Sequence, residues 1–253
     1  TRGITEFKTK YVRYQDFKGF PEIIGYNNIP ELERQWAAIS RYLSRADALE
    51  LPNRQMIGKN LKLTPPASKL YNTIKLTRVH PKTGEVYDNA PKLLNALRQS
   101  TTEPRLDALE SILSDTSDNV VVFYNYISER KAILKLLEKM GGKTVIRYDG
   151  EVHDTLPDSD AKLTNTVMLA HYKSGSTGLN LQWANTTVYF SPTYSYQEFE
   201  QSVGRTHRTG QKKKCVYYVF SVAGSVDDAV LSVLKNKQSF TERLALQYLD
   251  DNA

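Results

Sequence analysis

The sequence has one cysteine, four scattered histidines and no long hydrophobic run. Cys215 cannot form a disulfide within the chain, and it precedes the apolar residues 216–220, so we expect a buried strand thiol. The histidines have no cysteine neighbours at zinc-site spacing, so no metal site is predicted. No apolar run is as long as a membrane span and no signal peptide is visible, so we expect an intracellular protein without a membrane partner.

The sequence also lacks the two elements that grip a nucleotide in P-loop ATPases. A P-loop needs Gly-x-x-x-x-Gly-Lys-Ser/Thr between a strand and a helix, so that backbone amides hold the phosphates. The one candidate, residues 141–144, would need its first glycine at Leu137, and its helix precedes its strand. A helix C-cap explains Gly141 and Gly142 better. No predicted strand ends in an Asp-Glu pair for Mg²⁺, so we predict that this chain alone is not an ATPase.

What the chain does have is an alternation of strand-like and helix-like segments between residues 119 and 220. Runs rich in Val, Tyr and Phe predict strands, and apolar residues at helical spacing between them predict helices. Such alternation predicts an α/β fold, with a parallel sheet flanked by helices on both faces. Ligands of such sheets bind beyond the carboxyl ends of the strands. The predicted strands are 120–124, 143–148, 167–171, 187–190 and 216–220.

The remaining segments predict mostly helices. Residues 1–115 are interpreted as a linker-proximal region with a helical protrusion, and residues 116–253 as the sheet domain. A C-terminal helix is expected from residue 225 through Leu246, docked against the domain as a brace. The chain has 34 Lys and Arg against 28 Asp and Glu, a net charge of +6 that favours a nucleic-acid partner without requiring one. The helices expected before the sheet domain are 31–42, 65–76, 93–97 and one around 106–113.

The most specific stretch is residues 201–211, Gln-Ser-Val-Gly-Arg-Thr-His-Arg-Thr-Gly-Gln. If it is helical, Arg205 and Arg208 share one face, because positions i and i+3 are neighbours on a helix. Two guanidiniums on one face form a double fork for phosphate oxygens. The alternative from the residues alone is an exposed basic helix. The stretch resembles motif VI of the superfamily-two helicases, most closely in their Swi/Snf-like DNA translocase branch.

This resemblance implies a site shared between two lobes. In that family the arginines matching Arg205 and Arg208 reach the γ-phosphate of ATP bound on the opposite lobe. Gln201 and Gln211 are implied to fix the arginine segment. The implied cofactors are ATP and Mg²⁺, bound mainly by a first lobe, and the implied partners are that lobe and double-stranded DNA.

A second stretch, residues 168–184, is an apolar run that ends in a glycine-rich polar loop. Glycines let a backbone approach a ligand closely, and successive exposed amides can hold a phosphate. The stretch resembles motif V of the same family, in which Gly-Leu-Asn-Leu is typical. That resemblance implies that Gly178 and Asn180 couple a DNA contact to the nucleotide cleft and bind the cofactor with the arginines. The implied contacts with DNA phosphates are Lys173, Ser174 and Thr177.

Two weaker stretches occur in the expected order. Residues 120–126 resemble motif IV, and residues 144–150 resemble the short block that follows it. Tyr124 and Asn125 are candidate contacts with the DNA backbone, and a packing role for them is an equal alternative.

Together the motifs predict a RecA-like second motor lobe of an ATP-dependent DNA helicase or translocase. The alternative is a non-catalytic nucleic-acid-binding or protein-interaction module that retains the helicase fold. Retention of Arg205 and Arg208 favours the motor lobe, because a pure binding module needs no γ-phosphate sensor.

Overall fold

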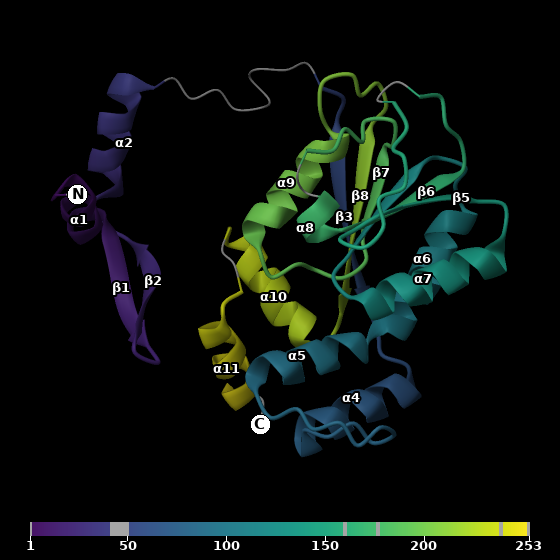
Figure 1. Ribbon diagram of the computed structural model, residues 1–253, viewed down its shortest axis with the longest axis horizontal. Helices are drawn as coiled ribbons and strands as arrows, with labels where there is room; N and C mark the ends of the chain where they lie inside the picture. The colour runs from purple at the N-terminus through teal and green to yellow at the C-terminus, as the bar shows by residue number, and fades with distance from the viewer. Residues whose placement is uncertain (1, 41–50, 159–160, 176–177, 238–239, 252–253) are drawn as a thin grey trace. The chain divides into compact units, whose positions relative to one another are not determined.

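The computed structural model divides the chain into two compact units, residues 1–50 and 51–253. The boundary predicted between residues 115 and 116 falls inside the second unit. The residues that the structure describes are 2–40, 51–158, 161–175, 178–237 and 240–251 (Figure 1).

The first unit contains an antiparallel hairpin between two helices. The hairpin was not predicted from the sequence. It turns at Lys18 and Gly19, which both have positive φ, and the Asp16 carboxylate accepts a 3.1 Å hydrogen bond from the Gly19 amide. The helix predicted at 31–42 starts two residues earlier, and residues 41 and 42 lie outside the described residues. The elements are α1 (Arg2–Tyr11), β1 (Val12–Phe17), β2 (Phe20–Tyr26) and α2 (Ile29–Ile39).

The second unit is built on a six-stranded parallel sheet of order β3-β8-β7-β4-β6-β5. The parallel sheet predicted from the sequence is confirmed, and each of the five predicted strands matches an observed strand within two residues at either end. A sixth strand, β3, precedes these five in the chain and forms one edge of the sheet. The strands are β3 (Arg54–Leu61), β4 (Val120–Tyr124), β5 (Thr144–Tyr148), β6 (Thr166–His171), β7 (Thr186–Tyr189) and β8 (Cys215–Val222).

Helices cover both faces of this sheet (Figure 1). One face packs against α6 (Thr102–Ser114) and α7 (Ile127–Met140), and the other against α8 (Tyr172–Gly175) and α9 (Tyr196–Thr206). All five residues of the central strand β4 are buried, and its side chains alternate between the two cores. Burial on both faces explains why β4 is a continuous apolar run rather than an alternating one.

A third core lies beyond the carboxyl ends of the strands, where α4 (Pro65–Thr77) follows β3 and α10 (Val226–Lys235) follows β8. These helices pack with α5 (Ala90–Gln99) and α11 (Glu242–Asp251) around residues such as Leu97, Val230 and Leu249. The single helix expected through Leu246 is wrong, because α10 ends at Lys235 and Lys237 adopts a positive φ that no helix continues through. The bracing role itself holds, since α11 packs on α5.

Four fully buried charged side chains tie this helical layer to the sheet. Arg105 lies between two carboxylates, with an ion pair to Asp227 and a 3.6 Å contact to Glu129. Arg98 adds a 3.4 Å contact from Nε to the other Asp227 oxygen. Two positive and two negative charges therefore neutralise one another where no water reaches them, as buried charges require.

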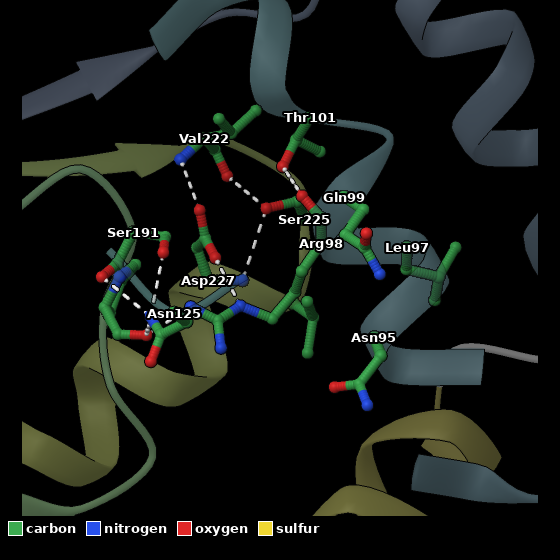
Figure 2. Close-up of polar contacts among 12 residues, drawn as sticks. Asn95, Leu97, Arg98, Gln99, Thr101, Asn125, Ser191, Val222, Ser225 and Asp227 are labelled. Atoms are coloured by element: carbon green, nitrogen blue, oxygen red, sulfur yellow. Dashed lines mark hydrogen bonds and ion pairs between the residues drawn. The ribbon is translucent and has the colours of Figure 1, made fainter. Parts of the chain in front are cut away.

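Hydrogen bonds from this cluster reach the loops at the ends of the strands (Figure 2). Asp227 accepts a 3.1 Å bond from the Val222 amide, and Arg98 donates to the Pro192 carbonyl. Glu129 accepts a 2.9 Å bond from the Ser191 hydroxyl. Burial alone would lower the pKa of Arg98, but Tyr126, Tyr194 and Asp227 outweigh it and raise that pKa, so Arg98 stays charged.

Candidate functional site

The arginine segment begins at the end of a helix and continues beyond it. Arg205 lies in the last turn of α9, which ends at Thr206, and Arg208 lies in the turn that follows. The expectation that both arginines share one helical face is therefore wrong. His207 leaves the helical region with φ −94° and ψ 82°, and Gly210 has a φ of +98°, so the chain turns instead. Both arginines are half-buried.

This segment lies beside the amino ends of the strands. The His207 ring bonds the Pro52 carbonyl at 2.8 Å, and Gln211 bonds the Ala184 carbonyl at 2.9 Å. Pro52 and Ala184 stand two residues before β3 and β7 respectively. The general rule that ligands bind beyond the carboxyl ends does not locate the arginines, because α9 runs antiparallel to the strands and returns the chain to their starts.

Gln211 fastens the arginine segment to the segment before β7. Its side-chain amide donates to the carbonyls of Gln182, Ala184 and Thr206 at 2.9–3.2 Å. Its oxygen accepts from the amides of the next two residues at 2.9 and 3.0 Å. Buried amide groups with full sets of partners fix one local geometry. Gln201, also predicted to fix the segment, is a half-buried residue one turn before Arg205 on α9.

The two motif-like stretches meet at Asn180. The Arg208 guanidinium donates to the Asn180 side-chain oxygen and, at 3.4 Å, to the Leu179 carbonyl. The Leu181 amide donates to the Arg205 carbonyl at 3.0 Å. Three of the residues predicted to bind the cofactor, Asn180, Arg205 and Arg208, are thus held together.

The stretch that resembles motif V leads from the carboxyl end of β6 to the amino end of β7. It starts at the carboxyl end of β6 with α8, which carries the exposed Lys173 and the half-buried Ser174. It passes through Gly178, whose φ of +73° favours glycine, and ends before β7. Thr177 lies outside the described residues. The predicted DNA contacts Lys173 and Ser174 therefore lie near the carboxyl end of β6, whereas Asn180 of the same stretch bonds Arg208.

Gly175 allows α8 to pack directly on the sheet. A Cβ atom at this position would lie 2.8 Å from both the Phe123 ring and the Ala170 Cβ, and both side chains are fully buried. Only glycine fits between them without a shift of the core.

We expect Gly175→Ala to destabilise the chain by about 1–3 kcal/mol, because buried atoms must move to admit the methyl group. Urea unfolding of the variant measures this change. Gly58→Ala is the matched control, since its Cβ would meet no atom within 4 Å. Equal stability of the two variants would contradict the close packing of α8.

Tyr124 and Asn125 are engaged inside the protein. Tyr124 is 1% exposed, and its hydroxyl donates to Asp149 at 2.7 Å. Asn125 donates to the Ser191 hydroxyl at 2.8 Å and to the Pro192 carbonyl at 3.0 Å (Figure 2). The geometry agrees with the packing alternative for both residues.

The Tyr124–Asp149 pair has a defined protonation state. Burial raises the pKa of Tyr124, and its bond to Asp149 raises it further, so the hydroxyl remains a donor. Burial also raises the pKa of Asp149, but hydrogen bonds from Tyr124 and Arg130 outweigh it and hold that pKa below its usual range. The pair orders the ends of β4 and β5 rather than offering a surface contact.

Sequence reasoning missed His207, which lies between the two arginines and is 8% exposed. Its bond to Pro52 ties the arginine segment to the start of β3. Its position between Arg205 and Arg208 was the only signal in the sequence. Among the described residues, no helix is long and apolar enough to cross a membrane, and no group of three His, Cys, Asp or Glu side chains is placed to hold a metal.

The sequence model of the helicase conserved C-terminal domain matches residues 104–210. This match includes residues 168–184, all but the last residue of 201–211, and the contact between Asn180 and Arg208. Residues 104–210 therefore match a helicase C-terminal domain, called the lobe below.

Curated relatives support the same assignment for the lobe. It is 31% identical to DNA repair protein rhp54 of Schizosaccharomyces pombe over 143 residues, 53% of this chain and 16% of that protein. It is 29% identical to DNA repair and recombination protein RDH54 of Saccharomyces cerevisiae over 169 residues, 65% of this chain and 17% of that protein. The chain therefore matches less than a fifth of the length of each of these relatives.

A solved structure has the same fold. The C-terminal part of the Fun30 ATPase domain superposes with a TM-score of 0.61, covering 79% of this chain and 97% of that one, at 15% identity. The predicted RecA-like fold of the lobe is thereby confirmed.

Proposed function

We propose that this chain is the second motor lobe of an ATP-dependent DNA helicase or translocase. In this proposal Arg205 and Arg208 bind the γ-phosphate of ATP held mainly by a first lobe, and α8 binds the DNA backbone. The contact between Arg208 and Asn180 carries the proposal, because it joins the arginine segment to the segment that begins at the DNA side.

Arg205 and Arg208, beside the amino ends of the strands, are suited to binding a triphosphate. Guanidiniums stay charged at all physiological pH values and bind phosphate oxygens through paired N–H groups. Bound Mg²⁺ would neutralise phosphate charge from the first lobe, and the described residues of this lobe offer no carboxylate cluster for it. Phosphoryl transfer depends mostly on positioning and charge stabilisation, which are what a rigidly held arginine pair supplies.

Movement would be coupled through residues 172–184. One end of this segment carries Lys173 and Ser174, and its other end bonds Arg205, Arg208 and Gln211. We expect a shift of the arginine segment on lobe closure to move Leu179, Asn180 and Gln182, which it contacts. Two discrete lobe arrangements would convert ATP turnover into steps along DNA.

Relatives named for DNA repair and recombination support DNA as the partner and an intracellular location, and the preference for double-stranded DNA rests on the motif resemblance. The alternative, a binding or interaction module without catalysis, predicts no role for the arginine pair. It is disfavoured because five hydrogen bonds order the arginine pair and the turn after it. These bonds are made by Gln211, Leu181 and Asn180.

The direct test compares this chain alone with the longer polypeptide that carries the first lobe. We expect no ATP hydrolysis by the chain alone and DNA-stimulated hydrolysis by the longer protein. Lys173→Glu should weaken DNA binding uniformly across sequences and reduce the salt dependence by about one charge. Lys135→Glu on α7 is the matched exposed control. Hydrolysis by the isolated chain, or equal DNA affinity of the two variants, would contradict the proposal.

A further inference from the structure

The positive charge of the chain is concentrated in one segment. Residues 51–103 carry nine Lys and Arg against three Asp and Glu, a formal charge of +6 that equals that of the whole chain. Residues 104–253, which contain every helicase-like motif, carry 17 against 18. The motifs therefore do not account for the basic character of the protein.

We propose that α4 and the loops flanking it form a second surface for the DNA backbone, separate from the contacts of α8. This basic surface consists of Lys62, Lys69, Lys75, Arg78 and Lys82. The proposal rests on DNA being the partner of the lobe, as proposed above, and adds where the duplex extends.

The fold exposes these cations. Ala67, Tyr71 and Ile74 form the buried face of α4, which packs on α5, and Lys69 lies outside that face and is exposed. Lys62, Lys69, Arg78 and Lys82 are exposed, and Lys75 is half-exposed. Arg78 adopts a positive φ as the C-cap of α4, which ends the helix and starts the loop that carries Lys82.

The positive charges of these five side chains are not neutralised by carboxylates among the described residues. Among the described residues none of the five forms an ion pair, whereas Lys92, farther along the same segment, pairs with Asp88 at 2.9 Å. Lys69 and Lys82 line a groove of about 550 Å³ between α4 and the junction of α5 and α6. One carboxylate, Glu103, also lines the groove, and it accepts a 3.0 Å bond from the Thr64 hydroxyl.

Duplex DNA suits this arrangement better than an isolated anion. Lys69 and Arg78 lie about 13 Å apart along the helix axis at 1.5 Å per residue, too far to share one phosphate. DNA presents about one negative charge per 1.7 Å of its axis, so cations spread over α4 and its flanking loops would each meet a different phosphate. Helix α4 follows the carboxyl end of β3, and Lys173 follows that of β6. Both surfaces therefore lie beside the carboxyl ends of the parallel strands.

The test measures the salt dependence of binding between the 253-residue chain and a labelled random-sequence DNA duplex. The variant Lys69→Glu/Arg78→Glu/Lys82→Glu changes three exposed side chains of the basic surface. The control Lys131→Glu/Lys135→Glu/Lys162→Glu makes the same change of charge at exposed positions elsewhere. We expect the first variant to bind at least about tenfold more weakly, with a slope of log affinity against log salt reduced by about three. The control should lose less than a third of that slope.

Glutamine substitutions at the same three positions remove the positive charge without adding repulsion. Circular dichroism checks that each variant is folded. Equal losses in the two triple variants would overturn the proposal, because net charge alone would then explain binding. Competition by polyglutamate as strong as that by DNA would overturn it as well, in favour of an acidic protein partner. A loss in the basic-surface variant with none in Lys173→Glu would support this surface and reject the proposed α8 contact.

Discussion

Replacing Arg205 or Arg208 by alanine should lower DNA-stimulated ATP hydrolysis of the longer protein by about 10³-fold or more, the scale of arginine fingers in phosphoryl transfer. The reason is that charge developing on the transferred phosphoryl group would lose a preorganised donor. Replacing Asn180 or Gln211 removes a hydrogen bond that orders the segment but no guanidinium, so the effect should be smaller. Steady-state hydrolysis over a range of ATP concentrations measures both turnover and KM.

Two control variants separate charge from geometry. Lys212→Ala removes an exposed cation next to the segment and should leave turnover unchanged. Arg208→Lys keeps the charge but loses the paired N–H groups, so most of the activity should still be lost. If Arg208→Ala matches Lys212→Ala in turnover, the arginine is not a finger.

Replacing Arg105 by alanine should destabilise the chain by about 3–5 kcal/mol, because it leaves the carboxylates of Asp227 and Glu129 buried with too little positive charge. Arg105 is fully buried and touches both of them. The same change would loosen the helical layer from the loops at the ends of β4 and β7. Urea unfolding of the chain, followed by circular dichroism, measures the loss.

The control for this effect is an exposed ion pair in the same unit. Arg147 bonds Asp154 through two nitrogens, and its side chain is 44% exposed. Exposed pairs contribute at most about 1 kcal/mol, so Arg147→Ala should change the free energy of unfolding little. Comparable losses for the two alanine variants would show that the buried cluster has no special role in stability.

Most of the sheet could be predicted from the sequence because five of its six strands have recognisable sequence patterns. Buried parallel strands such as 120–124 and 167–171 are continuous apolar runs, and helical patterns separate them. The order of motif-like stretches then identified the fold and the arginine segment. Strand β3 has no such apolar run, because as an edge strand it is mostly exposed and carries Arg54, Lys59 and Gly58.

The placement of the site could not be predicted in the same way. A helix pattern does not indicate where a backbone leaves the helix, and the turn at His207 depends on a bond to Pro52, 155 residues earlier. For the same reason the sequence left a DNA contact and a packing role equally open for Tyr124 and Asn125, whose partners, Asp149, Ser191 and Pro192, come from distant segments. Tertiary contacts, not local propensity, decided these positions.

The most direct test of the proposed motor lobe is the affinity of the longer protein for ADP with aluminium fluoride, a mimic of the phosphoryl-transfer transition state. Wild type is compared with Arg205→Ala/Arg208→Ala by titration with a fluorescent ADP analogue. Transition-state mimics bind at least about 10²-fold more tightly than substrates when donors are positioned for the transition state. The account predicts that the variant loses this advantage and binds ADP alone as well as wild type does. Equal affinity of both proteins for the mimic would contradict it and leave the chain as a binding module with a helicase fold.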